Sequence, residues 1–236
     1  MGAERVTRLI LMHLPKTAGA SVRGVALRHY PAGQNIHVRP AFGRTDTTRN
    51  EAEWMETHTR FQQRERCRLV TGHARWGVHR LLPGDSEYAI CLRDPEERLV
   101  SMYRWLSESR QARSRRWVRG GFAGFLASGL ADLENGMTRM LAGRADVGDE
   151  RVMSPVTEAD YALAVRRLES CHVVGVFDDL PGYVRRLAGR YGWEGDLSLP
   201  RVHVARSSQP LKTGGLAGLN EFDSELYRLA TVRAAT

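Results

Sequence analysis

The sequence predicts a three-layer α/β fold with a short central parallel sheet and a helical insert. Short apolar runs of strand length alternate along the chain with segments of helical spacing, and this alternation is typical of parallel sheets. The first apolar run also leads through a loop of small residues into a helix, as at many phosphate-binding sites. At 236 residues the chain is within the range of one domain, so residues 1–236 are expected to fold together.

The first strand, loop and helix open the chain. Residues Arg8–Leu14 (RLILMHL) form an apolar run that a proline ends, which predicts a buried strand. Small residues follow, and Ser21 is placed to cap a helix that stops at Tyr30 and the next proline. The polar and basic stretch 32–50 predicts an excursion over the surface, and a helix is expected over 51–66.

Two more short strands, Arg68–Thr71 and Tyr88–Leu92, are predicted in the middle of the chain. The sequence Asp-Pro-Glu-Glu that follows predicts a helix start, because proline fits the first helical position and acidic side chains suit the first turn. Asp94 and Arg98 are one helical turn apart, so we expect an ion pair between them. Helical spacing interrupted by glycines over 117–143 predicts the helical insert.

The last third of the chain continues the alternation. The sequence TEAD fits a capping box that opens a helix over 158–168, and Cys171–Phe177 (CHVVGVF) predicts the fourth strand. Two further helices are expected over 180–191 and 221–232, the second capped by Asn220.

Composition narrows the class of protein. The formal net charge is +8, so the surface is expected to attract anions. The densest basic cluster, Arg110–Arg119, has no nucleic-acid-binding motif around it, so no nucleic-acid partner is expected. There is no long apolar run and no signal-peptide pattern, which predicts a cytoplasmic protein without a membrane partner. The three widely spaced cysteines predict free thiols and no metal site: Cys67, Cys91 and Cys171.

The loop after the first strand has the composition of a phosphate-binding loop. Only Lys16 and Lys212 are lysines among the 35 basic residues, and a lysine is a more compact cation than an arginine. In Pro15–Ser21 (PKTAGAS) small residues let the backbone approach an anion, and Thr17 and Ser21 add hydroxyl donors. The arrangement is P-loop-like, but it is not a Walker A motif because the lysine precedes the glycine. An ordinary turn with one surface lysine is the alternative.

Two segments carry a resemblance to a known family. His13–Ser21 (HLPKTAGAS) resembles the 5′-phosphosulfate-binding loop of the carbohydrate sulfotransferases, the family that includes the heparan sulfate 2-O-sulfotransferases and bacterial relatives. Leu92–Ser101 (LRDPEERLVS) resembles the 3′-phosphate motif of that family, and weaker similarity continues over 134–143 and 168–177. The resemblance implies a sulfotransferase that uses 3′-phosphoadenosine 5′-phosphosulfate (PAPS) and acts on a carbohydrate or a small natural product. No metal is expected, because a sulfuryl group carries less charge than a phosphoryl group.

The expected PAPS site combines both motifs. Arg93 follows the third predicted strand, where its guanidinium could bind two phosphate oxygens, and Ser101 lies two helical turns further on. The alternative is that Arg93 pairs with a nearby acid and Ser101 faces solvent. Arg206, with Ser207 and Lys212, resembles a late loop that covers the cofactor. The full set of expected PAPS-binding residues is Lys16, Thr17, Ala18, Gly19, Ala20, Ser21, Arg93, Ser101 and Arg206.

His73 is the candidate general base. It follows the second predicted strand at the same sheet edge as the loop, and an imidazole titrates near neutral pH. The resemblance implies a catalytic histidine here, although the relatives have His-Gly-His where this chain has Thr71. The alternative for His73 is a histidine that caps a strand end. His13 is expected to be a packed residue, and Trp76 either stacks on the acceptor or packs in the core.

The predicted chemistry is sulfuryl transfer with His73 as base and Lys16 stabilising the leaving phosphate. Two other functions stay open. A small-molecule kinase of P-loop type would need a magnesium-binding acid, for which Asp94 is the placed candidate. A non-catalytic nucleotide-binding or anion-binding module would use Lys16 and Arg93 but would have no role for His73.

Overall fold

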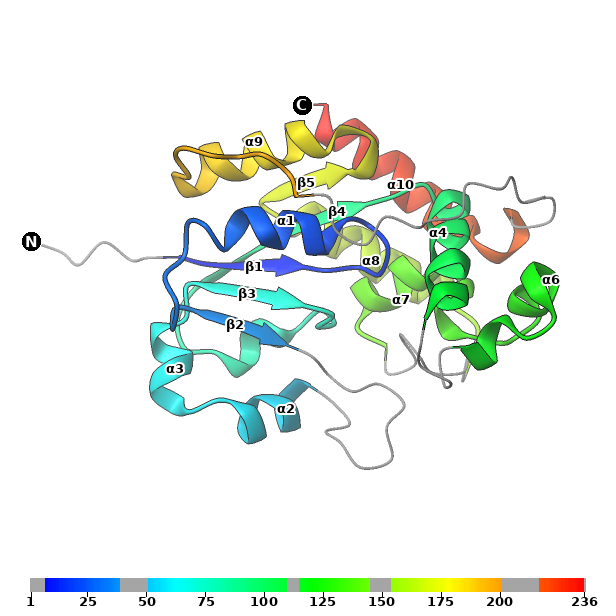
Figure 1. The fold of residues 1–236 in the computed structure, drawn as a ribbon, viewed down its shortest axis with the longest axis horizontal. Coiled ribbons are helices and arrows are strands. Elements are labelled where there is room, and N and C mark those ends of the chain that lie inside the picture. The colour runs from blue at the N-terminus through cyan, green and yellow to red at the C-terminus, as the bar shows by residue number, and fades with distance from the viewer. Residues whose placement is uncertain (1–6, 39–50, 110–114, 145–153, 201–216, 236) are drawn as a thin grey trace, which may run out of the picture.

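The computed structural model describes residues 7–38, 51–109, 115–144, 154–200 and 217–235. Within them lies one five-stranded, all-parallel sheet with the strand order β2-β3-β1-β4-β5 (Figure 1). Its strands are β1 (Arg8–Met12), β2 (Asn35–Val38), β3 (Leu69–Gly72), β4 (Ser86–Leu92) and β5 (Val173–Val176). Helices cover both faces, so the predicted three-layer α/β class is confirmed.

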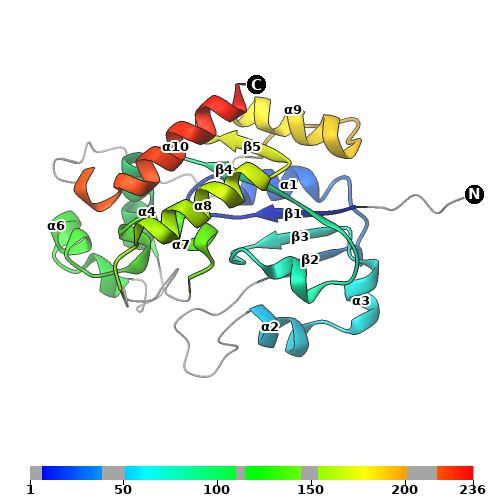
Figure 2. The same cartoon turned by 180° about the vertical axis from the view of Figure 1, so that it is seen from behind.

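The two faces of the sheet are buried against different helices. In β1, Leu9 and Leu11 pack toward α1 (Gly19–Ala26) and α9 (Leu180–Tyr191). Ile10 and Met12 point the opposite way, as the two-residue period of a strand requires. Their face is covered by α7 (Gly136–Ala142), α8 (Glu158–Ser170) and α10 (Glu221–Ala234), which Figure 2 shows in front of the sheet.

The prediction of a surface excursion over 32–50 is wrong at Asn35–Val38, which forms the edge strand β2. Ile36 pairs with Val70 of β3, and only Ile36 and Val38 of this strand are buried. Such an edge strand needs few apolar residues, so its apolar run is too short to stand out in the sequence. The central strands β1 and β4 are buried along almost their whole length and were predictable.

The helix expected over 51–66 is two helices, α2 (Glu51–His58) and α3 (Phe61–Arg66). The hydroxyl of Thr59 donates to the carbonyl of Met55, and Arg60 is extended with φ −86° and ψ 154°. A threonine that bonds back to the preceding turn competes with helix continuation. The helix therefore ends there and restarts after one extended residue.

The predicted helical insert is divided between two regions. The segment α6 (Gly121–Leu126) packs with α4 (Pro95–Glu108) around Phe125, Leu99 and Met102, in a cluster separate from the sheet. In contrast, α7 lies against the sheet in the main core. Short 3₁₀ helices in the described chain connect these elements: Val78–Leu81, Arg116–Val118, Ala131–Leu133, Phe177–Asp179 and Ala217–Leu219.

The helix starts agree with the sequence in part. Thr157 and Asp160 form the predicted capping box of α8, and α9 spans the predicted residues. The expected Asp94–Arg98 ion pair is wrong, because the Asp94 carboxylate accepts from the Glu97 amide at 3.0 Å and caps α4. Asn220 precedes α10, but its side chain does not cap that helix.

The side-chain oxygen of Asn220 instead accepts from the backbone N–H of Asn135 at 3.2 Å. A competing N–H donor from another part of the fold therefore occupies the side-chain oxygen that was predicted to cap α10. The cysteines Cys67, Cys91 and Cys171 are buried free thiols, as expected. Among the described helices, none combines the length and apolar character that crossing a bilayer requires.

Candidate active site

The carboxyl ends of the strands bring the predicted site residues to one edge of the sheet. Because all strands are parallel, the residues that follow β1, β3 and β4 emerge at the same edge, which in Figure 1 faces α4. A guanidinium nitrogen of Arg93 lies 3.4 Å from the carbonyl oxygen of Lys16. The Nδ1 atom of His73 lies 2.9 Å from the carbonyl oxygen of His13. The loop, the second motif and the candidate base are thus one cluster.

The loop after β1 has an unusual backbone. Lys16 has φ 69° and Ala18 has φ 64°, and in the described chain only Asn135 is another non-glycine residue with positive φ. Left-handed conformations are costly for residues with a Cβ, and such strain concentrates at functional sites. Left-handed residues in tight turns occur in the anion-binding nests that backbone N–H groups form at phosphate sites.

Helix α1 begins directly after these left-handed residues. The carbonyl of Ala18 accepts from the amides of Ser21 and Val22 at 2.9 and 3.1 Å, so the first closed turn starts at Ala18. The amides of Gly19 and Ala20 lie within that first turn and, like the leading amides of any helix, have no acceptor inside the helix. They lie at the positive end of the helix dipole, which favours a bound phosphate or sulfate group.

The two predicted hydroxyl donors of the loop differ in their surroundings. Thr17 is 1% exposed, and its hydroxyl donates to the carbonyl of Leu14 at 3.0 Å. That hydrogen bond holds the loop in shape. Ser21, in the first turn of α1, is partly exposed. Ser21 is therefore the better placed of the two to meet a ligand.

Lys16 is a partly desolvated cation. Burial, and then the positive charge of Arg93, lower the pKa of Lys16 to about 8, while the carboxylate of Glu108 acts in the opposite direction. Its ammonium nitrogen lies 5.4 Å from the ring centre of Trp105 in α4. A cation held near another cation, with incomplete solvation, gains from the arrival of an anion.

Arg93 is held from two sides at the end of β4. Its guanidinium lies 3.8 Å from the ring centre of Phe177, which follows β5, and it pairs with the Glu97 carboxylate at 3.2 Å. The pair with a nearby acid is thus present, and the Glu97 side chain is 57% exposed. An exposed pair of this kind contributes only about 0–1 kcal/mol. A phosphate could displace Glu97 at small cost, with partly exposed Ser101 on the same helix.

The contact with His13 determines which nitrogen of His73 can act as a base. A carbonyl oxygen only accepts hydrogen bonds, so Nδ1 of His73 carries the proton in this contact. In the neutral ring the lone pair is then on Nε2. The rings of His73 and His13 also stack, with 4.2 Å between their centres. The same contacts are available to a structural histidine at a strand end.

His13 is the packed residue that the sequence predicted. A Cβ at Gly19 would lie only 1.9 Å from Cδ2 of His13, so its ring fills the space beside the loop. Burial is the main cause that lowers the pKa of His13 well below its usual value, and His73, His37 and Lys16 add to this effect. His13 is therefore neutral at physiological pH.

Sequence reasoning missed three aromatic residues at this edge. His37 of β2 places its Nδ1 atom 2.8 Å from the Thr71 hydroxyl. It was missed because β2 was missed. Phe177 could be found only through the pairing of β4 with β5. Trp105 is one helical turn after Ser101, a spacing that the sequence does contain.

Trp76 belongs to the core. Its ring stacks on Tyr88 with 4.0 Å between centres, and its backbone N–H donates to the carbonyl of Met140. The Tyr88 hydroxyl in turn accepts from the amide of Gly77 at 3.1 Å. Of the two roles open to Trp76, core packing is the one observed.

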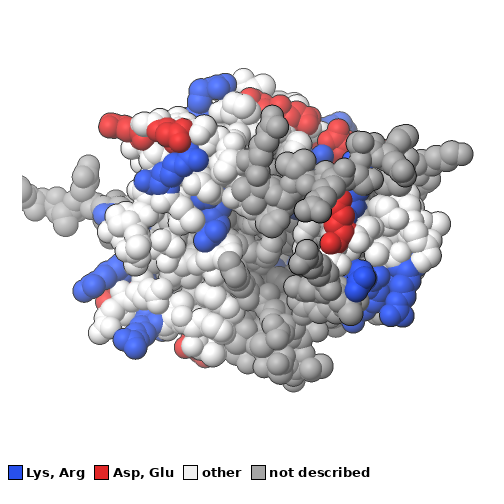
Figure 3. Space-filling model, viewed as in Figure 1, with Lys and Arg blue, Asp and Glu red and all other residues white. Residues whose placement is uncertain are grey.

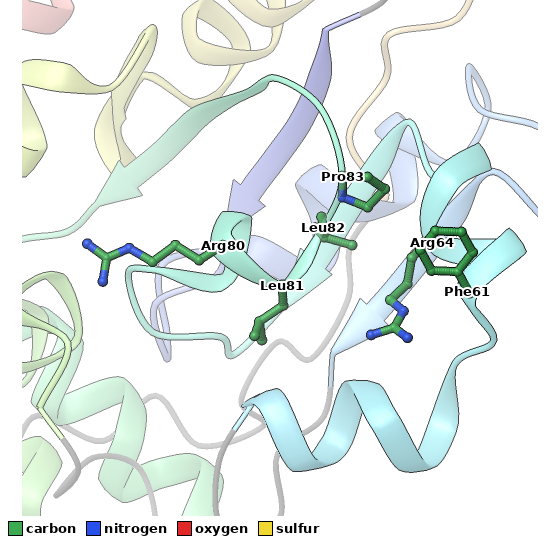
Figure 4. Close-up of a pocket in the computed structure, with 6 residues that line it drawn as sticks. All are labelled: Phe61, Arg64, Arg80, Leu81, Leu82 and Pro83. Carbon is green, nitrogen blue, oxygen red and sulfur yellow. The ribbon is translucent and has the colours of Figure 1, made fainter.

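Other parts of the molecule contribute less to a binding site. A cavity of about 440 Å³ lies between α3 and the segment before β4, and its lining is shown in Figure 4.

In Figure 3 the described Lys and Arg side chains stand in separate groups on the face of the molecule that Figure 1 shows. In the described ranges, no group of three or more His, Cys, Asp or Glu side chains could hold a metal ion. Arg206, Ser207 and Lys212 lie outside the described residues.

A scan against protein families finds no matching family model, and a search of curated proteins finds no significant match.

Proposed function

We propose that the protein is a sulfotransferase that moves a sulfuryl group from PAPS to a hydroxyl of a carbohydrate or a small natural product. One observation carries the proposal. Two motifs that are far apart in the sequence meet in space, where Arg93 lies 3.4 Å from the carbonyl oxygen of Lys16. The two phosphate-bearing ends of PAPS are attached to one ribose, so their binding groups must lie close together.

The residues present fit such a donor. The left-handed residues Lys16 and Ala18 and the leading amides of α1 form a cradle for the 5′-phosphosulfate. Strands β1 and β4 are neighbours in the sheet, so Arg93 is one strand away from that cradle. Arg93 and Ser101 would bind the 3′-phosphate, with Arg93 giving up its exposed partner Glu97.

The side chains can then perform the transfer. Bound PAPS supplies a sulfuryl group whose bond to the phosphate oxygen breaks as the acceptor oxygen bonds to sulfur. Lys16 stabilises the charge on the leaving phosphate, and an anion beside it favours its protonated form. Nε2 of His73 takes the proton of the acceptor hydroxyl. The proposal needs no metal, because a sulfuryl group carries less charge than a phosphoryl group.

Thermal unfolding with nucleotides tests the donor. 3′-Phosphoadenosine 5′-phosphate (PAP), the product of the proposed reaction, should raise the melting temperature, with about 2.7 kcal/mol added at one hundred times Kd. ATP with magnesium should do so much less, since Asp94, the acid that a kinase would need, caps α4. An equal or larger shift with ATP and magnesium would favour the kinase.

Turnover tests the reaction. The protein is incubated with sulfur-labelled PAPS and a panel of glycans, glycosylated natural products and phenols, and products are detected by the mass of one added sulfuryl group. We expect label in at least one class. Tight binding of PAP without any transfer would favour the non-catalytic module.

A further inference from the structure

Trp105 is an exposed aromatic side chain beside the candidate active site. It is 42% exposed, and it is one of few large apolar side chains on the surface of the described chain. The buried face of α4 is formed by Leu99, Met102 and Leu106, so Trp105 lies off the face that packs into the protein. The indole therefore adds little to this packed face, and its described contact is with the Lys16 ammonium at the candidate site.

The position of Trp105 relative to Lys16 indicates which substrate the indole contacts. The ammonium nitrogen of Lys16 lies 5.4 Å from the ring centre of Trp105. In the proposed reaction Lys16 is at the phosphosulfate end of the donor. The adenine is attached to the opposite side of the ribose, so the group that arrives next to the sulfuryl end is the acceptor.

We propose that Trp105 is the stacking platform for the acceptor, and that the acceptor presents its hydroxyl on a neutral ring with a flat apolar face. A sugar ring and a phenol share this chemistry. The inference rests on the proposed function and deepens it. The centres of stacked rings lie about 4.5–7 Å apart. The hydroxyl of an acceptor ring that stacks on Trp105 would therefore lie close to the Lys16 ammonium, which is 5.4 Å from the centre of the indole.

Ligand-observed NMR on PAP-saturated protein tests the inference without knowledge of the natural acceptor. The probes are phenol and methyl β-D-glucopyranoside, and saturation transfer to their ring protons reports stacking. We expect transfer to at least one probe in the unmodified protein, about tenfold weaker binding of it in Trp105→Ala, and partial retention in Trp105→Phe. The probe that binds distinguishes phenols from sugars.

A matched control is Phe61→Ala. Phe61 is 61% exposed on α3, which Figures 1 and 2 place on the opposite side of the molecule from α4. This variant should bind PAP and both ring probes as the unmodified protein does. Calorimetry with PAP on Trp105→Ala completes the set, and the PAP affinity should be unchanged.

The outcomes separate the inference from the function on which it rests. If Trp105→Ala weakens PAP and leaves the ring probes unaffected, the indole belongs to the donor site and the inference is overturned. It is also overturned if neither ring probe binds the PAP-saturated unmodified protein. If the unmodified protein does not bind PAP, the proposed function itself fails.

Discussion

Two arginines of the second motif have opposite environments. Arg93 lies at the sheet edge, where it contacts an exposed glutamate and one face of Phe177. Arg98, in the first turns of α4, is fully buried, with a guanidinium nitrogen 3.6 Å from the Asp223 carboxylate and a hydrogen bond of 2.6 Å to the carbonyl of Asp132. The two residues are of the same type and belong to the same short motif. What separates the candidate ligand-binding arginine from the structural one here is the burial of the arginine and the rigidity of its partner.

The buried region around Arg98 is tightly connected. The Asp223 carboxylate of α10 accepts from the amides of Met137 and Thr138 at 3.0 and 2.8 Å, so it caps α7 while it faces Arg98. A Cβ at Gly136 would lie 2.9 Å from the Arg98 guanidinium, so glycine is needed there for space. The sheet edge has strained backbone and replaceable partners, whereas this network has fixed ones.

The largest expected effect is in the buried network. Asp223→Ala leaves the buried Arg98 charge without its partner and removes the cap of α7, so the free energy of unfolding should fall by about 3–5 kcal/mol. Urea denaturation measures it. Glu225→Ala, on the same helix and in an exposed pair with Arg228, should change stability by about 0.5 kcal/mol or less. A loss below about 1 kcal/mol for Asp223→Ala would show that the network is not structural.

A substitution at the sheet edge should remove the activity and leave the fold intact. His73→Ala removes the candidate base and should lower the rate of sulfuryl transfer about a hundredfold or more. PAP binding, measured by calorimetry, should be nearly unchanged because the proposed role of His73 is toward the acceptor hydroxyl and not toward the phosphates of the donor. Full activity of the variant would place the base elsewhere.

Gly19→Ala tests the contact between the loop and His13. The added methyl group would lie 1.9 Å from the His13 ring, so we expect a loss of about 1–3 kcal/mol and weaker PAP binding. The control is Gly189→Ala in α9, where nothing lies within 4 Å and alanine should be neutral or stabilising by up to about 1 kcal/mol. Equal stability of the two variants would contradict the close approach.

Arg93→Ala should have the smallest effect on stability. The ion pair with exposed Glu97 contributes little, and the contact with Phe177 is also lost, so the free energy of unfolding should fall by about 0.5–1 kcal/mol. PAP affinity should fall about tenfold or more with the loss of a charged contact. Arg228→Ala removes another exposed arginine pair and should leave PAP affinity unchanged. Calorimetry that finds the same affinity for Arg93→Ala and the unmodified protein would remove Arg93 from the site.

The sequence predicted those parts of the fold whose signals are local. The central strands β1 and β4 are apolar on both faces, and α9 is bounded by Asp179 at its start and Gly192 at its end. For these elements the hydrophobic pattern and the capping residues are sufficient to predict the structure. The edge strand β2 shows only the alternation of Ile36 and Val38. A prediction from periodicity does not separate so short a pattern from a loop.

The candidate site was predictable as a set of residues but not as a geometry. Lys16 and Arg93 stood out because each follows a predicted strand, and parallel strands share an edge. The left-handed backbone at Lys16 and Ala18 could not be foreseen, because residues with a Cβ rarely adopt it. The partner of Arg98 comes from a helix far along the chain, so the local spacing to Asp94 indicated the wrong ion pair.

The His13 ring lies against Gly19 and stacks on His73, so it links these two positions sterically. The thickness of one imidazole sets the gap between the start of α1 and the candidate base. A chain with a larger residue at 19 would need a smaller one at 13, and His73 would then lose its stacking partner. Residues 13, 19 and 73 are thus sterically coupled. If the loop were replaced by one from another protein, all three residues would have to be replaced together.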